Sequence, residues 1–129
     1  YVFHTAALKH VPSCERAPTE AVRTNILGVE NVYRAAMSAG VRKVLFTSSD
    51  KAVNPTNVMG TSKLMGERLI TAANALTQGE NGPVFASTRF GNVAGSAGSV
   101  VPLFCRQIAQ GQAITLTHRD MTRFLMTLN

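Results

Sequence analysis

Short runs of apolar residues alternate along this chain with longer stretches of helical periodicity, and this alternation limits the possible folds more than any other feature. Residues 1–4, 44–46 and 84–90 are typical of buried strands. Helices are expected from Pro18 or Thr19 to Gly40, and from Val58 to Leu76. Strands that alternate with crossover helices predict a parallel sheet covered by helices, in an α/β fold.

The remaining segments are expected to connect these elements. Residues 12–18 read as a loop, 79–83 as a turn and 91–98 as a loop rich in glycine and serine. Ser99 is expected to cap a third helix that runs through Gln110, and residues 114–116 are expected to form a short strand. The apolar positions of the first two long helices predict the faces that they bury: Val22, Ile26, Val29, Tyr33 and Ala36 in the first, and Met65, Leu69, Ala72 and Leu76 in the second.

Composition excludes several classes of protein. With 129 residues, 45% of them hydrophobic, the chain has room for one domain with a real core, and it is too apolar for a disordered tail. No apolar run approaches the ~20 residues that a membrane helix needs, and no signal peptide is visible. Cys14 and Cys105 are too few for a disulfide scaffold or a four-cysteine zinc site, and His4, His10 and His118 lack metal-ligand spacing. We therefore expect no metal.

The net charge of +6 predicts an anionic partner. The basic residues are spread along the chain without a lysine and arginine block, and tryptophan is absent. A phosphate-bearing metabolite therefore fits better than nucleic acid. The chain begins and ends within apolar segments and has no initiator methionine, which favours a fragment of a longer protein. A G-x-G-x-x-G motif is absent after the first strand, so the first half of any dinucleotide-binding fold would lie upstream.

Ligands of parallel sheets sit beyond the carboxyl ends of the strands, where this chain carries unusual polar residues. Ser49, Asp50 and Lys51 follow the second strand and combine a hydroxyl, a carboxylate and an amine. A polar loop exit with a surface ion pair would give the same sequence. Met59 and Lys63 share one face of the next helix, although a thioether cannot take a proton at neutral pH. A core methionine beside a solvent-facing lysine is the alternative.

Three further features carry a candidate role and a plain structural alternative. Asn25 interrupts an apolar stripe, so it either bonds neighbouring backbone or braces the active-site strand, and both are compatible. Residues 89–99 could hold a phosphate at the start of the third helix, or form a flexible loop. Arg119 and Arg123 could neutralise a diphosphate, or belong to a solvated basic face.

Taken together, these segments resemble the extended short-chain dehydrogenase/reductase superfamily. Within it they are similar to the bacterial nucleotide-sugar 4,6-dehydratases of the polysaccharide-biosynthesis (CapD-like) group. The resemblance implies that 1–112 is the C-terminal half of a Rossmann domain that binds NAD or NADP, and that 113–129 begins a truncated substrate-binding region. The matching segments span nearly the whole chain in family order: residues 4–12, 24–25, 49–52, 54–55, 60–63, 89–93, 95–102 and 121–124.

The implied reaction converts UDP-N-acetylglucosamine into a UDP-4-keto-6-deoxy-N-acetylhexosamine for glycan biosynthesis. By resemblance, Asp50 would protonate the leaving C6 hydroxyl, Lys51 would remove the C5 proton and Ser49 would bind the C4 oxygen. Lys51 favours the N-acetylhexosamine branch, because related dTDP-glucose dehydratases carry Asp-Glu at positions 50 and 51. The implied cofactor contacts are Thr5, Ala6, Ala7, Lys9, Asn25, Lys63 and Arg89, and the implied substrate contacts are Asn92, Ser99, Val100 and Arg123.

Met59 occupies the position of the family's usual tyrosine base. Members with methionine there resemble a longer branch that has an N-terminal membrane region and retains the C5 configuration. We hypothesise that Ser49, relayed to Lys63, deprotonates the C4 hydroxyl instead. The resemblance further implies a cytoplasmic catalytic domain, a homo-oligomer, and no nucleic acid or membrane contact from this segment. The fragment alone is expected to be inactive and to expose apolar surface.

Two other functions stay open. A UDP-sugar 4-epimerase of the same superfamily would leave the mass of the sugar unchanged, whereas a dehydratase removes water. A catalytically silent dinucleotide-binding protein would bind cofactor without turning over any sugar, and Met59 leaves room for it. A nucleic-acid-binding module would instead show steep salt-dependent binding to any duplex.

Overall fold

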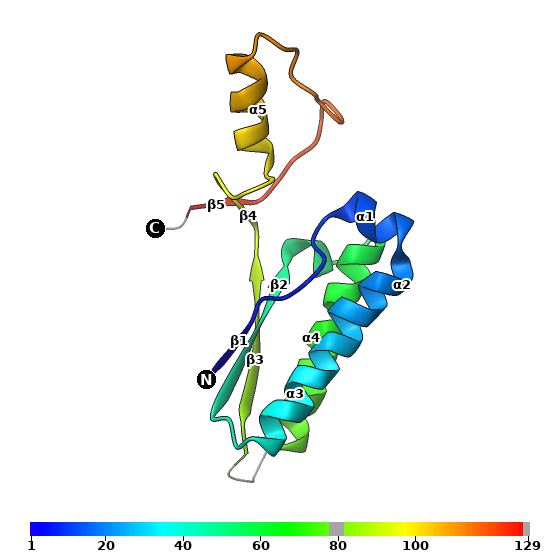
Figure 1. Cartoon of the computed structure of the whole chain (residues 1–129), viewed down its shortest axis with the longest axis vertical. Coiled ribbons are helices and arrows are strands. Elements are labelled where there is room, and N and C mark those ends of the chain that lie inside the picture. The colour runs from blue at the N-terminus through cyan, green and yellow to red at the C-terminus, as the bar shows by residue number, and fades with distance from the viewer. Residues whose placement is uncertain (78–81, 128–129) are drawn as a thin grey trace. The chain divides into compact units, whose positions relative to one another are not determined.

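The computed structural model describes residues 1–77 and 82–127, which belong to two compact units, Tyr1–Arg89 and Phe90–Asn129. The first unit is an α/β layer with a three-stranded sheet (Figure 1). The boundary expected at residue 112 concerns the domains of the whole protein and stays a prediction. The elements of the first unit are β1 (Val2–His4), α1 (Val11–Arg16), α2 (Pro18–Ala21), a π-helical segment η1 (Val22–Leu27), α3 (Gly28–Ser38), β2 (Lys43–Ser49), a 3-10 turn η2 (Asp50–Ala52), α4 (Val58–Leu76) and β3 (Val84–Phe90).

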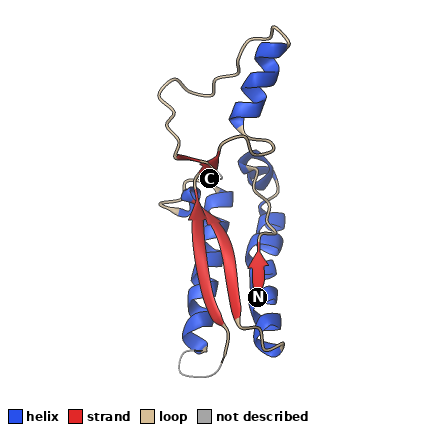
Figure 2. Ribbon diagram, turned by 90° about the vertical axis from the view of Figure 1, so that its left-hand side faces the viewer, coloured by secondary structure: helices blue, strands red, loops and turns tan. Residues whose placement is uncertain are grey.

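The sheet has the order β1-β2-β3. β1 pairs in parallel with β2, with Val2 opposite Val44 and His4 opposite Phe46. The arrowheads of β2 and β3 point the same way (Figure 2), and α3 and α4 lie together on one face of the sheet (Figure 1). The prediction of a parallel α/β sheet with crossover helices is therefore confirmed.

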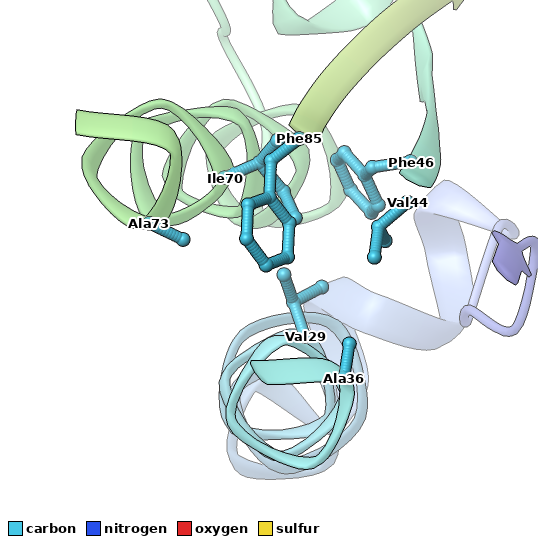
Figure 3. Close-up of a cluster of buried hydrophobic side chains, with 7 residues drawn as sticks. All are labelled: Val29, Ala36, Val44, Phe46, Ile70, Ala73 and Phe85. Carbon is cyan, nitrogen blue, oxygen red and sulfur yellow. The ribbon is translucent and has the colours of Figure 1, made fainter. Parts of the chain in front are cut away.

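The main core lies between the sheet and the two long helices. Figure 3 shows Phe46 and Phe85 pointing from the strands toward Val29 of α3. Tyr33 meets the Phe85 ring edge-on, with centroids 6.4 Å apart. Burying a side chain of this size stabilises a fold by roughly 1.5–3 kcal/mol, so this cluster fixes how the helices sit on the sheet. The buried members are Val29, Ala36, Val44, Phe46, Ile70, Ala73 and Phe85.

A second, smaller core joins α1 and α2 to the start of α4. Cys14, Ala21 and Met59 are its buried members. The loop expected at 12–18 is wrong, because Val11–Arg16 is a short helix. Pro12 stands in the first turn of α1, where its missing N–H costs no hydrogen bond, so proline opens this helix rather than breaking it.

The helix expected from 18 to 40 forms, but a π-helical segment interrupts it at Val22–Leu27. Val22, the first residue of this segment, is exposed, although the sequence predicted it to be buried. Val29 and Ala36 are buried and Tyr33 is partly buried, as predicted. Gly40, with φ of 62°, terminates the helix in the left-handed conformation.

The bounds predicted for α4 are confirmed, but of the predicted buried face only Leu69 packs against the main core, where it is partly buried. Met65 and Leu76 are exposed, and Ala72 is exposed as well. Gly66 packs closely against the Phe46 ring: a Cβ added to Gly66 would lie 2.7 Å from Phe46 Cζ. Glycine at this position allows that close approach. The buried residues of α4 are instead Met59, Gly60, Ser62, Lys63, Gly66, Ile70 and Ala73.

The second unit holds β4 (Asn92–Val93), α5 (Val100–Ala109) and β5 (Leu125–Met126), with β4 and β5 parallel. The strand expected at 114–116 is wrong, since these residues are exposed and without strand pairing. The Gln107 amide binds both the backbone N–H and the hydroxyl of Thr115, which ties this segment to α5 instead. Of the turn expected at 79–83, residues 79–81 lie outside the described residues.

Candidate active site

Two of the predicted polar loops follow strands of the same sheet. Residues 5–10 follow β1, and η2 follows β2 directly after Ser49. Because β1 and β2 are parallel neighbours, their carboxyl ends lie at the same edge. The third expected loop, at 91–98, belongs to the second unit and is described with it.

Ser49, Asp50 and Lys51 form one hydrogen-bonded group. Ser49 Oγ donates to Asp50 Oδ1 at 2.9 Å, and Lys51 Nζ reaches the same oxygen at 3.0 Å. The backbone N–H of Lys51 donates back to Ser49 Oγ at 3.2 Å, so Ser49 caps the 3-10 turn. Both charged side chains are partly exposed. The group therefore brings an acid, a base and a hydroxyl together where solutes can reach them.

The pKa of Asp50 lies below its ordinary value. Burial raises this pKa, but hydrogen bonds from Lys51 and Ser49, together with the Lys51 charge, outweigh burial. The carboxyl is therefore ionised at neutral pH in this arrangement. It must gain a proton before it can act as an acid.

Lys63 is buried, so it is not the solvent-facing lysine of the structural alternative. Its Nζ donates to the carbonyl oxygen of Thr47 in β2 at 2.9 Å and lies 4.9 Å from the centroid of the Phe46 ring. Burial lowers the pKa of Lys63. The expected relay from Ser49 is not formed here, because Ser49 donates to Asp50 and Lys63 to Thr47.

Met59 shares the inner face of α4 with Lys63, as predicted. Its side chain packs in the apolar cluster with Cys14 and Ala21, which is the core role that the sequence left open. One residue further on, a Cβ on Gly60 would collide with the backbone carbonyl of Lys51. Glycine at this position lets α4 start directly against the turn that carries Asp50 and Lys51.

Asn25 takes the structural role considered for it, bonding to backbone close to it in space, and what it braces is the loop after β1 rather than a strand. Its Oδ1 accepts from the backbone N–H of Leu8 at 2.8 Å, and its Nδ2 donates to the Leu8 carbonyl at 2.9 Å. Nδ2 also donates to Ser62 Oγ on α4 at 2.9 Å. The amide is 1% exposed and sits within the π-helical segment. It satisfies its own polar atoms while bracing the loop that follows β1.

The predicted cofactor contacts of that loop are accessible. Thr5, Ala6 and Lys9 are exposed and Ala7 is partly exposed, on either side of the backbone that Asn25 holds. Arg89 makes a two-pronged ion pair instead, with its Nε and Nη2 at 2.8 and 2.7 Å from the two carboxylate oxygens of Glu67. The guanidinium of Arg89 holds the pKa of Glu67 below its usual value. Any contact between Arg89 and a ligand would compete with Glu67.

The predicted substrate contacts lie in the second unit. The Asn92 N–H donates to the Phe124 carbonyl at 2.7 Å, and Gly91 leaves room for that carbonyl, because an added Cβ would lie 2.8 Å from it. Arg123 Nη1 donates to the Thr122 carbonyl at 2.8 Å. Ser99 occupies the N-cap position of α5 as predicted, but its side chain makes no capping bond, and Val100 begins the helix exposed.

Sequence reasoning missed the residues that hold the site together. Thr47 accepts from Lys63 and donates its hydroxyl to the His4 carbonyl at 3.2 Å, which joins β1 to β2. Ser62 accepts from Asn25 and donates to the Met59 carbonyl at 2.8 Å. Asn57 caps α4 through its bond from the Gly60 N–H at 2.8 Å. Only Asn57 had a usable signal, since asparagine directly before a helical pattern is a typical N-cap.

Two features, a metal site and a membrane-spanning helix, find no support in the part of the chain that the structure describes. No three histidine, cysteine or acidic side chains gather there as a metal site would require. No helix within these residues combines the length and apolar character needed to cross a bilayer.

Two curated relatives match nearly the whole chain. A UDP-glucose 4-epimerase from Rickettsia akari is 55% identical over 129 residues, which is 99% of this chain and 37% of that protein. A protein from Methanocaldococcus jannaschii, described as an uncharacterized membrane protein, is 54% identical over 128 residues, 99% of this chain and 38% of its own. The chain thus spans less than two fifths of the length of these relatives.

Solved structures extend the comparison to the fold. The X-ray structure of Pen from Bacillus thuringiensis is 55% identical with a TM-score of 0.94, over 99% of this chain and 40% of that one. MoeE5, solved in complex with UDP-glucose and NAD, is 24% identical with a TM-score of 0.84, over 98% of this chain and 47% of that one. At this identity MoeE5 shows a common fold alone. A family model described as "Polysaccharide biosynthesis protein" matches residues 1–129.

Proposed function

Because this chain belongs to the polysaccharide biosynthesis protein family, we propose that the protein carrying it is a nucleotide-sugar 4,6-dehydratase. The proposed substrate is UDP-N-acetylglucosamine, and the proposed product is its 4-keto-6-deoxy derivative. The observation that carries the proposal is the hydrogen-bonded group of Ser49, Asp50 and Lys51 at the carboxyl end of β2. An acid beside a base is what elimination of water across two adjacent carbons requires.

The proposed roles follow from the chemistry of each side chain. Asp50, once protonated, donates to the C6 hydroxyl as it leaves as water. Lys51, as the amine, removes the C5 proton that oxidation at C4 has made acidic. Ser49 forms a hydrogen bond with the oxygen on C4. The 3.0 Å contact between Lys51 Nζ and Asp50 Oδ1 keeps the acid and the base within reach of neighbouring sugar carbons.

The residues present fit a nicotinamide dinucleotide. Lys63 carries three N–H donors on a buried ammonium, and Thr47 accepts from one of them, so donors remain for ribose hydroxyls. Thr5, Ala6 and Ala7 offer an accessible backbone at the sheet edge, beside the position that Asn25 fixes. When bound, NAD or NADP supplies a hydride acceptor for C4 and returns the hydride to C6. Roles for Lys9 and Arg89 in binding it stay predictions, as do substrate contacts from Asn92, Ser99, Val100 and Arg123.

A 4-epimerase is the second candidate, because the relative from Rickettsia akari carries that name at 55% identity. An epimerase also needs transient oxidation at C4, but it has no use for an acid and a base at C5 and C6. The Asp50–Lys51 pair therefore favours the dehydratase. Attachment of the whole protein to a membrane is a further proposal, supported by the description of the relative from Methanocaldococcus jannaschii as a membrane protein, and the choice of the bacterial inner membrane rests on the resemblance alone. Assembly into a homo-oligomer is proposed on the resemblance alone.

Product analysis tests the proposed function. The complete protein is incubated with UDP-N-acetylglucosamine and either NAD or NADP, and the sugar is followed by mass spectrometry and proton NMR. Loss of one water and a new C6 methyl signal are expected. An unchanged mass with inverted C4 would establish the epimerase, and an unchanged sugar with bound cofactor would indicate a silent binding protein.

A further inference from the structure

The hydroxyl proton of Ser49 has a defined direction in this structure. Ser49 Oγ donates to Asp50 Oδ1 at 2.9 Å, and it accepts from the Lys51 backbone N–H at 3.2 Å. A serine hydroxyl has one proton and two lone pairs, so one lone pair remains for a substrate alcohol. A hydroxyl bound in this way can take a proton from an alcohol on one side while it gives its own to a carboxylate on the other.

Met59 and Lys63, which lie on the inner face of α4, are poorly suited to take the proton of the substrate alcohol. The Met59 thioether lies in an apolar cluster and is not basic. Lys63 holds its ammonium against the Thr47 carbonyl at 2.9 Å, and an ammonium has no lone pair to offer. Asp50, by contrast, is an ionised carboxylate already joined to Ser49.

We propose that Ser49 passes the proton of the substrate's C4 hydroxyl to Asp50, so that oxidation at C4 supplies the proton that later leaves with the C6 hydroxyl. This inference rests on the proposed dehydratase function. In the first step the C4 O–H bond breaks and its proton joins Ser49 Oγ, while the former Ser49 proton joins Asp50 Oδ1. The C4 hydrogen departs as hydride to an oxidised nicotinamide dinucleotide, which leaves a C4 ketone.

This transfer also prepares the base. Protonation of Asp50 removes the negative charge that is paired with the Lys51 ammonium at 3.0 Å. In the next step Lys51 acts as the amine, having given one proton to water that its partly exposed side chain can reach. The amine takes the C5 proton as a C5–C6 double bond forms, the C6–O bond breaks with its electron pair, and the Asp50 proton completes the departing water.

The later steps restore the starting state. Asp50 is again a carboxylate and Lys51 again an ammonium once water has left. The hydride returns to C6, Lys51 gives its proton to C5, and it regains one from solvent. Each proton and electron pair is thereby accounted for, with the nicotinamide dinucleotide the only co-reactant.

A comparison of Asp50→Asn with Lys51→Met in the complete protein separates the relay from a role of Asp50 at C6 alone. Reduced nicotinamide is followed by absorbance after addition of UDP-N-acetylglucosamine. The relay predicts that Lys51→Met still oxidises C4 and accumulates reduced cofactor, whereas Asp50→Asn slows that oxidation by about 100-fold or more. Equal oxidation by both variants would overturn the relay while leaving the dehydratase intact. Absence of the C6 methyl product with the unsubstituted protein would instead overturn the proposed function.

Ser49 variants provide a second test that does not depend on Asp50→Asn folding. Ser49→Ala is expected to lose oxidation at C4 to a similar extent, and Ser49→Thr, which keeps a hydroxyl, to restore most of it. The Asp50 carboxyl carbon is also titrated by NMR in cofactor-free protein labelled with carbon-13 aspartate. Ser49→Ala should raise the pKa of Asp50 and Ser49→Thr should not. An unchanged pKa in Ser49→Ala, or normal oxidation by it, would contradict the relay.

Discussion

One buried amide, Asn25, connects three parts of the first unit. It pairs with both backbone polar groups of Leu8 and with the Ser62 hydroxyl, so the loop after β1, the π-helical segment and α4 meet at a single side chain. The amide lies within the π segment and is buried. A local irregularity of the helix thereby serves the edge of the sheet where we place the cofactor.

Asn25→Ala is expected to destabilise the complete protein by about 2–3 kcal/mol, because it removes the hydrogen bonds of a buried amide to both Leu8 backbone groups and to the Ser62 hydroxyl. Urea unfolding measures the change. Asn31→Ala, at an exposed position of the same helical stretch, is the matched control and should stay within ~0.5 kcal/mol of the parent. Equal effects of the two substitutions would contradict the bracing role.

The burial of Lys63 should make the stability of the protein depend on pH. Burial depresses its pKa in the folded state, so between the folded and unfolded pKa values the unfolded chain binds more protons. The free energy of unfolding should therefore rise with pH as the solution approaches the ordinary lysine pKa. Lys63→Met should remove this rise, as measured by urea unfolding at several alkaline pH values. An identical slope in both proteins would show that Lys63 is not desolvated in solution.

The grouping of the candidate catalytic residues could be predicted from the sequence, but their hydrogen bonds could not. Ser49, Asp50 and Lys51 are adjacent, so the end of one strand was enough to place them together. The partner of the Ser49 hydroxyl depends on side-chain torsions within the 3-10 turn. The partner of Lys63 is the carbonyl of Thr47, which belongs to a different element, β2. Neither hydrogen-bond partner can be inferred from the spacing of the residues along the chain.

At the scale of elements, α4 shows how a buried helix face can be hidden from a hydrophobicity pattern. Its inner stripe contains Gly60, Ser62, Lys63 and Gly66, whereas large apolar residues such as Met65 point outward. The bounds of the helix were predictable from its length and its flanking polar residues. The buried face was not, because close approach to Phe46 and to the Lys51 carbonyl selects small residues.

Gly66→Ala is expected to destabilise the protein by about 1–3 kcal/mol, although alanine normally favours a helix over glycine by up to ~1 kcal/mol. The new Cβ would lie 2.7 Å from Cζ of the buried Phe46 ring. Gly28→Ala is the matched control, since its Cβ would find its nearest neighbour at 3.6 Å, and it should be neutral or stabilising. Thermal unfolding of both variants checks the difference, and a stabilising Gly66→Ala would contradict the packing of α4 against β2.

At the scale of the whole molecule, this chain supplies less than two fifths of each curated relative described above. The part described here holds the sheet edge and the hydrogen-bonded group of Ser49, Asp50 and Lys51, together with a second unit that carries the expected substrate contacts. The alternation of strands and helices predicted the sheet because each element there is long and strongly patterned. The second unit was less predictable, since its strands are two residues long and the segment at 114–116 is tied down by polar bonds to Gln107.

Expressed alone, residues 1–129 are expected to self-associate, because β1 is an edge strand whose Phe3 side chain is 71% exposed. Sedimentation velocity measures the distribution of species. Phe3→Ser should reduce association with little change in stability, since the side chain buries little area within the chain. A monomeric parent chain at micromolar concentration would be the contrary result.

The central claim is that Asp50 and Lys51 are the acid and the base of a dehydration, and one reaction tests it most directly. The complete protein and its Lys51→Met variant are each given UDP-N-acetylglucosamine and oxidised cofactor, and the sugars are followed by proton NMR. A C6 methyl product is expected from the parent, and from the variant a 4-keto sugar that keeps its C6 hydroxyl. A C4 epimer from both proteins would contradict it, because an epimerase does not need Lys51 as a base.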